Sequence, residues 1–363
     1  MSPWRQFKRT ALIVVCALAP ALAQEASSGF DLRATVSAEA LYSNNLPAYQ
    51  KSGSNVAGGF RAMVYPVWKL SDHWVVSGAV EAYSLLYFPA DLYSPGDGVR
   101  VRILQANLGY SRTWKNASLN IRAGQLTSAF GSFLLRYDDA DNALTDPPLQ
   151  YGYYLTGITT LGLAGAQADA TIGKWDARAQ FTNSSTANAR SVFDNDQFGA
   201  WAGGGGYTIR QGLHVGLSGF RGPFLNSSNA FYFPGRPVRD LPSSGWGADA
   251  EWAVGHWNLY SEWQRIDLAY NVIRTYREDA GYVEARRVLN PRLYLAGRAG
   301  YVHTDYVGYG GNIFEAVAGY RLNTRQLIKA GYEIGHKSGS GNLTSTVVLQ
   351  LVTTIHPLSM AFN

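Results

Sequence analysis

Apolar and polar residues alternate with a period of two along most of the chain after residue 28. The clearest stretch is 30–42, in which every even position is apolar and the odd positions from Asp31 to Glu39 are polar. Successive side chains of a β-strand point to opposite faces, so this pattern predicts a strand with one apolar and one polar face. An alternating run of this length is rare in soluble sandwich proteins.

The same alternation recurs in segments that we expect to pair as hairpins. The phase of one segment, 99–114, changes near Ile103 and Leu104, which predicts a β-bulge. The sixteen predicted strands cover residues 30–42, 60–69, 74–83, 99–114, 117–123, 164–172, 175–181, 198–209, 213–218, 246–254, 257–266, 276–288, 293–303, 314–320, 328–334 and 343–355.

The connections between these segments alternate between long polar stretches and short turns. This asymmetry is typical of outer-membrane barrels, which have long external loops and short periplasmic turns. Tryptophans gather at the short turns, as expected for an aromatic girdle at a membrane interface: Trp68, Trp74, Trp114, Trp175, Trp252 and Trp257. We therefore predict an all-β fold, a 16-stranded antiparallel transmembrane β-barrel, which is wide enough to enclose an aqueous channel.

One stretch, 127–154, interrupts the alternation with aspartates, aromatic residues and the pair Pro147 and Pro148. Prolines at these positions cannot join a sheet ladder. A loop of this length in a compact fold usually has a function, and its aromatic residues favour packing against other parts of the chain. We predict a constriction loop folded into the barrel bore, and an external cap is the alternative.

The N-terminal residues predict export. Arg5, Lys8 and Arg9 precede the apolar run 11–18, and small residues follow at 21–23, so residues 1–23 are expected to be a cleaved signal peptide. Residues 24–363 then form a single barrel domain. The only cysteine, Cys16, leaves with the signal peptide, so we expect no disulfide in the mature protein.

Composition and charge exclude several classes of protein. Without the three basic residues of the signal peptide, 28 Lys and Arg face 26 Asp and Glu, and the net charge falls from +5 to +2. This charge implies no nucleic-acid partner. No apolar run after residue 23 approaches the ~20 residues of a membrane-spanning helix. Aromatic residues at 13%, charged residues at 16% and 39 glycines fit a barrel wall instead.

The segment Arg122-Ala-Gly-Gln125, followed by Phe130-Gly131, resembles the end of the fifth strand and the start of the constriction loop in Gram-negative porins. It is also loosely similar to the phosphate-selective porin-like families. The resemblance implies a third external loop that narrows a water-filled channel in the outer membrane, contact with outer-membrane lipid, and a homotrimer. The expected function is passive diffusion of small hydrophilic solutes and ions.

Two features depart from the porin pattern. The loop holds only Arg136 against four aspartates, so anion specificity is not expected. Porins commonly end on an aromatic residue, whereas this chain ends Phe362-Asn363.

Charged residues of the loop and of nearby strands are the candidates for lining the pore. Opposed loop aspartates and wall arginines would create a transverse field across the constriction; alternatively, each arginine pairs with a neighbouring carboxylate and braces the wall. The two interpretations are compatible. The candidates are Arg136, Asp138, Asp139, Asp141 and Asp146 in the loop and Arg33, Arg61, Arg102 and Arg122 on the strands.

Three other functions compete with diffusion. The loop aspartates offer oxygen ligands for calcium, but Leu144 stands where an EF-hand requires glycine, so we expect no metal and no cofactor. A hydrolase would need a nucleophile beside a base, yet the histidines are scattered and no GxSxG, HExxH or SxxK occurs, so no enzyme is expected. An adhesin that binds through external loops, chiefly 223–244, stays open.

Overall fold

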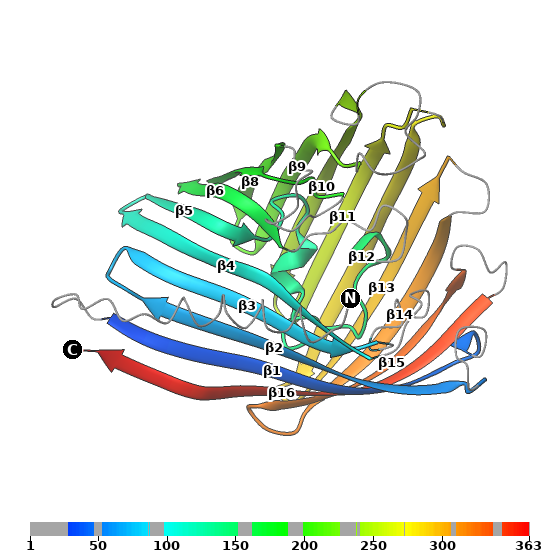
Figure 1. The fold of residues 1–363 in the computed structure, drawn as a ribbon. Coiled ribbons are helices and arrows are strands. Elements are labelled where there is room, and N and C mark those ends of the chain that lie inside the picture. The colour runs from blue at the N-terminus through cyan, green and yellow to red at the C-terminus, as the bar shows by residue number, and fades with distance from the viewer. Residues whose placement is uncertain are drawn as a thin grey trace.

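Sixteen strands of the described residues form one closed antiparallel barrel (Figure 1). Each strand pairs with its neighbours in sequence, and β1 closes the ring by pairing with β16. The computed structural model describes residues 28–46, 53–85, 87, 98–151, 162–187, 199–225, 237, 240–271, 273–305, 310–336 and 343–362. The predicted signal peptide and residues 152–154 of the predicted loop lie outside these ranges. The architecture predicted from the alternation, an all-β closed barrel, is confirmed.

The strands are β1 (Ser28–Ser43), β2 (Val56–Lys69), β3 (Trp74–Ser84), β4 (Val99–Trp114), β5 (Ala117–Leu126), β6 (Leu163–Ile172), β7 (Trp175–Thr182), β8 (Ala200–Arg210), β9 (Leu213–Pro223), β10 (Pro242–Val254), β11 (Trp257–Leu268), β12 (Tyr276–Asn290), β13 (Leu293–Thr304), β14 (Gly310–Arg321), β15 (Gln326–His336) and β16 (Leu343–Phe362). Two short 3₁₀ turns, η3 (Phe133–Arg136) and η4 (Leu149–Tyr151), follow β5. No helix in the described ranges has the length and apolar character to cross a membrane.

The burial of side chains follows the alternation in sequence. In β1, Thr35, Ser37 and Glu39 are buried, whereas the intervening apolar residues are exposed. Large apolar side chains such as Trp175 and Leu217 are likewise exposed on the outside of the wall. Since the polar face is the buried one, the barrel reverses the usual arrangement of a soluble protein, and its apolar exterior suits a hydrocarbon environment.

The two ends of the barrel differ as predicted. The connections after β2, β4, β6, β8, β10, β12 and β14 are two to four residues long, and the intervening connections are longer. The backbones of Ser28 and Phe362 pair at the end that carries the short turns, because the adjacent Gly29 pairs with Lys69 beside the first short turn. The tryptophans predicted to form a girdle flank these turns.

The phase change predicted in 99–114 is a β-bulge. The pairing of β3 with β4 passes from Val80 opposite Ile103 to Ala79 opposite Gln105, which leaves Leu104 as the extra residue. Leu104 turns into the barrel and packs against Met63 and Ala79, whereas the alternation had placed it on the same face as the outward residues that follow. The bulge lets both halves of β4 keep their apolar residues outside.

The last strand is longer than predicted. The expected end at Ile355 reflects His356-Pro357, which interrupt the alternation, but β16 continues to Phe362. A register shift between Leu32 and Ala34 of β1 accommodates the two residues. Proline lacks an N–H donor and is tolerated at such an irregularity. The extension lengthens the pairing between β1 and β16, the seam that closes the barrel.

Gly124 at the end of β5 offers a test of the wall geometry. Its φ of 132° is unfavourable for other residues, and a Cβ there would collide with the backbone of Ala106 and Asn107. We expect Gly124→Ala to lower the free energy of unfolding in detergent by about 1–3 kcal/mol. In the control Gly109→Ala, the new Cβ would make only ordinary contacts, the nearest 3.6 Å from Arg122 Cγ, so little change is expected. Equal stability of the two variants in denaturant titration would contradict this account.

Candidate functional site

The loop segment 127–151 begins beside β7 and β9. The Gln180 side chain of β7 donates to the carbonyl of Thr127 (2.7 Å) and accepts from the backbone N–H of Ala129 (3.0 Å). The ring of Phe130 packs edge to face on Phe220 of β9, with centroids 4.8 Å apart. These contacts direct the chain away from the rim and along the buried face of the wall (Figure 1).

The buried carboxylate of Glu262 on β11 joins the start and the end of the segment. It accepts hydrogen bonds from the backbone N–H of Ser132 (3.1 Å) and from the hydroxyl of Tyr151 (2.5 Å). The hydroxyl of Tyr282 on β12 also donates to this carboxylate, at 3.1 Å. Gly131 has a positive φ of 81°, and a Cβ there would collide with Tyr151 and Glu262, so the tight approach requires glycine.

Two consecutive residues of the segment reach nearly opposite sides of the ring. Arg136 donates to Glu284 on β12 at 2.8 Å, and its guanidinium lies 3.7 Å from the centre of the Tyr260 ring. Tyr137 donates its hydroxyl to Glu81 on β3 at 3.1 Å. In a closed ring of sixteen strands, β3 and β12 are seven strands apart by the shorter route. The segment therefore connects two distant parts of the wall.

A fully buried arginine anchors the segment to β2. Arg61 donates to Glu81 and to Asp139, both at 2.8 Å, and to the carbonyl of Tyr137 at 3.1 Å. Burial alone would raise the pKa of Asp139, but the charges of Arg61 and Lys329 outweigh it and hold the pKa below its usual value. Asp139 is therefore a structural anion of the docked segment.

Asp138 and Asp141 lie beside Arg33 of β1. The buried Asp138 accepts from Thr35 (2.9 Å) and Tyr65 (2.5 Å), and its carboxylate lies 3.6 Å from Arg33. Asp141 lies 3.7 Å from Arg33 and keeps 52% of its side-chain surface exposed. Burial and the charge of Asp138 raise the pKa of Asp141. Acid therefore neutralises Asp141 before Asp139.

The return of the segment docks on β13, β14 and β15. Lys329 donates to the carbonyls of Asp139 (2.8 Å) and Leu144 (3.0 Å). Glu315 accepts from both the backbone N–H and the hydroxyl of Thr145, each at 2.8 Å. Arg298 donates to Glu315 at 2.6 Å and to the carbonyl of Asp146 at 2.8 Å. These strand residues hold the loop backbone rather than its carboxylates.

Exposure divides the nine charged residues predicted to line a pore. Arg61, Asp138, Asp139 and Asp146 are buried, whereas Arg33, Arg102, Arg122, Arg136 and Asp141 keep exposed side-chain surface. Of the four wall arginines, Arg33 and Arg61 pair with loop aspartates. Arg102 instead pairs with Glu81 at 2.6 Å, and Arg122 with Asp169 at 2.8 Å.

Several residues that hold the segment were not foreseen in this role. Alternation placed Glu262 and Arg298 on the inner face, but nothing in sequence joined them to a loop more than a hundred residues away. Glu315 and Lys329 also lie at inward positions of alternating stretches, which is the only signal that the sequence carries for them. In the described part of the chain, no group of three or more His, Cys, Asp or Glu could hold a metal ion.

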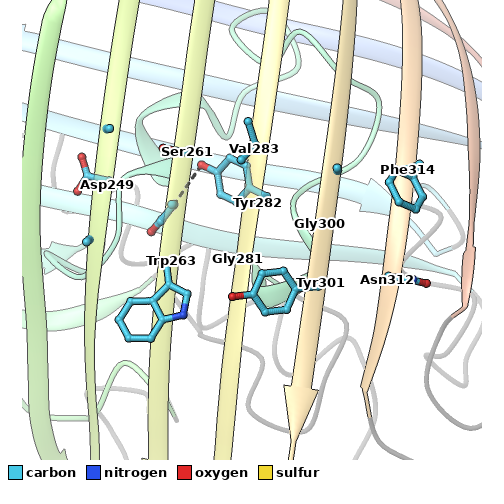
Figure 2. Close-up of a pocket in the computed structure, with 14 residues that line it drawn as sticks. Asp249, Ser261, Trp263, Gly281, Tyr282, Val283, Gly300, Tyr301, Asn312 and Phe314 are labelled. Carbon is cyan, nitrogen blue, oxygen red and sulfur yellow. Dashed lines mark hydrogen bonds between the residues drawn. The ribbon is translucent and has the colours of Figure 1, made fainter.

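A groove of about 580 Å³ lies on the outer side of the wall, over β10–β14. Figure 2 shows Trp263 on β11, Tyr301 on β13 and Phe314 on β14, with Gly281 on the intervening strand β12. These aromatic residues have the parity of the exposed face, opposite to that of Glu262. The groove therefore belongs to the apolar exterior and not to the bore.

Three solved structures illustrate the similarity of this fold to known proteins. OmpT of Vibrio cholerae, folded in vitro and in trimer form, is 14% identical over 91% of this chain and 100% of its own, with a TM-score of 0.61. An anion-selective porin from Comamonas acidovorans is 10% identical over 90% and 100%, with a TM-score of 0.62. Salmonella typhi OmpF, in complex with daunomycin, is 10% identical over 90% and 97%, with a TM-score of 0.61.

No protein-family profile and no curated protein matches the sequence of this chain. The similarity to solved structures therefore concerns the fold. The chain therefore has a porin-like fold, a closed β-barrel of sixteen antiparallel strands, as the alternation had predicted.

The ion pair between Arg61 and Asp139 should dominate the docking of the segment. We expect Asp139→Asn to lower the free energy of unfolding at pH 7 by about 3 kcal/mol, because it leaves a buried cation short of a partner. The exposed control Asp141→Asn should cost less than about 1 kcal/mol. Denaturant titration of the barrel in detergent, followed by tryptophan fluorescence, measures both.

The pH dependence follows from the lowered pKa of Asp139. Its stabilising contribution is complete above the usual aspartate pKa of about 3.9 and is lost as the pH falls through the lower folded-state value. The stability difference between wild type and Asp139→Asn should therefore shrink on acidification to about pH 3. A difference that stays constant or grows would show that Asp139 is not held as an anion.

Proposed function

We propose that this protein is a porin of the outer membrane that lets small hydrophilic solutes and ions diffuse through a water-filled channel. The main support is the segment 127–151, which connects β2 and β3 to β12 through two ion pairs and a hydrogen bond of the Tyr137 hydroxyl. A sixteen-stranded barrel is too wide for its wall side chains alone to fill. A segment fixed across such a bore narrows it without closing it, which is the role of a constriction loop.

Transport would be passive. Hydrated solutes would pass between the docked segment and the wall, and the charged side chains that remain exposed there would set an ionic preference. No bond is made or broken, so the protein needs only a fixed aperture. The rigidity of that aperture comes from the buried ion pairs of Arg61, Arg136 and Arg298.

The proposed location is the outer membrane of a Gram-negative bacterium, reached after cleavage of the signal peptide at residues 1–23. The exposed apolar residues of the wall support contact with outer-membrane lipid. We propose no enzymatic activity. In the described residues His214 is the histidine that contacts a carboxylate, 2.7 Å from Asp176, and its hydrogen bond is to that carboxylate rather than to a nucleophile.

A homotrimer is part of the proposal. On the outward face of β6–β9, one cross-strand row contains only small residues, and it lies as a shallow strip between the exposed side chains of Trp201 and Leu217: Ala168, Ala179, Gly203 and Gly219. β7 has only eight residues, fewer than the roughly 9–11 of a tilted membrane-spanning strand. A short wall with a shallow strip between large apolar side chains is better covered by a second copy of the chain than by lipid.

Planar-bilayer recording of the refolded mature protein tests the diffusion proposal. We expect stable conductance steps, because the docked segment leaves an aqueous aperture. The empty bilayer with detergent is the control. A folded, heat-modifiable barrel that gives no steps would overturn the proposal and would favour an adhesin that acts through its external loops.

Bulky substitutions on the outer wall test the trimer. Ala179→Trp should convert the oligomer in mild detergent to monomers, because a large ring would fill the shallow strip of small residues and hold the two walls apart. The matched control Ala318→Trp, outward on β14, should leave the oligomer intact. Native mass spectrometry measures the mass. A wild-type protein that is monomeric in detergent and after crosslinking in membranes would contradict the assignment.

A further inference from the structure

The contacts of the docked segment are unevenly distributed around the ring. Beyond its first residues, they go to β1–β3 and β11–β15, with Arg102 of β4 at the boundary. Most inward wall side chains in this half are buried, with Arg33 as an exception at 39% exposure, and the buried ones include Arg61, Glu81, Lys329, Thr346 and Gln350. This half of the interior is therefore filled by protein.

The other half, along β4–β10, is different. Its inward charged residues keep exposed surface: 32% for Asp169 on β6 and 32% for Asp176 on β7. Two cross-strand rows of this wall contain glycines in place of side chains. The first runs from Arg178 through Gly204 and Ser218 to Gly247, and the second from Asp176 through Gly206 and Gly216 to Asp249.

The glycines make room for the charged groups of the second row. A Cβ at Gly206 would collide with His214 and Asp176, and a Cβ at Gly216 would lie 2.7 Å from the carboxylate of Asp249. His214 lies over Gly206 and contacts Asp176 at 2.7 Å. The cluster therefore depends on a wall without side chains on β8 and β9.

The edge of the docked segment also faces open space. Leu135 is 77% exposed, although its neighbour Arg136 is anchored to Glu284 and Tyr137 to Glu81. Because the segment lies inside the barrel and connects opposite walls, the exposed side chain of this leucine faces the open part of the bore. The open passage is therefore bounded by Leu135 on one side and by the wall of β4–β10 on the other.

On these grounds we propose that solutes cross the barrel through a single passage along the inner face of β4–β10, called the lane below, and that this passage prefers small cations. This inference rests on the proposed function. The carboxylates of the lane wall are Asp169, Asp176, Asp249 and Glu251, against the arginines Arg100, Arg122 and Arg178. Arg102 and Arg136, at the margins, are already paired with buried glutamates. Negative charge is therefore in excess, and it is supplied by the wall rather than by Asp138 and Asp139.

Thiol accessibility locates the lane. The chain beyond the predicted signal peptide has no cysteine, so single cysteines can be placed at will. Asn120→Cys on β5 and Thr208→Cys on β8 lie at inward positions of the lane, and Thr346→Cys and Val352→Cys are matched inward positions on β16 in the filled half. A charged methanethiosulfonate reagent should label the first pair and lower their conductance stepwise, and leave the second pair unchanged.

Labelling is also measured by mass spectrometry on the folded barrel, so it tests the lane even if the protein conducts nothing. Absence of conductance would overturn the proposed function alone. Rapid labelling of Thr346→Cys and Val352→Cys with protected Asn120→Cys and Thr208→Cys would overturn the lane.

Reversal potentials in a salt gradient test the source of selectivity. Asp176→Asn combined with Asp249→Asn should reduce the ratio of cation to anion permeability severalfold. The control Glu39→Gln, a buried carboxylate on β1, should leave the ratio unchanged. Heat modifiability on gels confirms that each variant is folded. An unchanged ratio in the double variant, or an equal change in Glu39→Gln, would overturn the assignment.

Discussion

Closure of the barrel at the seam between β1 and β16 is the constraint on which the rest of the structure depends. A wall in hydrocarbon must satisfy every backbone N–H and C=O internally, so a ring of strands is stable there only when it has no edge. The seam runs from Ser28 opposite Phe362 to Ser43 opposite Thr346, with a single irregularity beside Pro357. Once the ring is closed, alternation assigns each side chain to the outside or to the bore, and the polar set must be accommodated inside.

The polar interior determines how a loop can dock. Apolar loop residues such as Leu144 and Leu149 pack against buried apolar clusters of the wall. The carboxylates and backbone carbonyls of the loop also find partners in Arg61, Arg298 and Lys329. Buried charges are expensive to desolvate and require nearly complete pairing. Arg61 meets this requirement with two carboxylates and a carbonyl. The four aspartates of 127–154 are thereby explained in part as docking groups.

Sequence alone predicts the wall well because its signal is local. Period-two alternation, short turns and the phase change at Leu104 are each contained in a few residues, and each reappears in the structure. The continuation of β16 past His356-Pro357 was missed because its support comes from β1, more than three hundred residues away. The partners of the loop were missed for the same reason: alternation identifies inward residues such as Glu315 but not which of them the loop reaches.

The unequal filling of the bore also depends on contacts between residues that are far apart in the sequence. Residues 138–149 carry the groups that bind β1, β2 and β13–β15, so the loop leans toward that half of the ring. Among the described residues, the opposite wall contacts mainly the first residues of the segment, through Gln180 and Phe220, and its inward rows contain glycines and exposed charges. An inward side chain can either hold the docked loop or face water in the bore. A fully buried ion pair holds the loop and therefore has no contact with water. The aspartates that most clearly suggest a pore in the sequence, Asp138 and Asp139, are those that the docked loop removes from water.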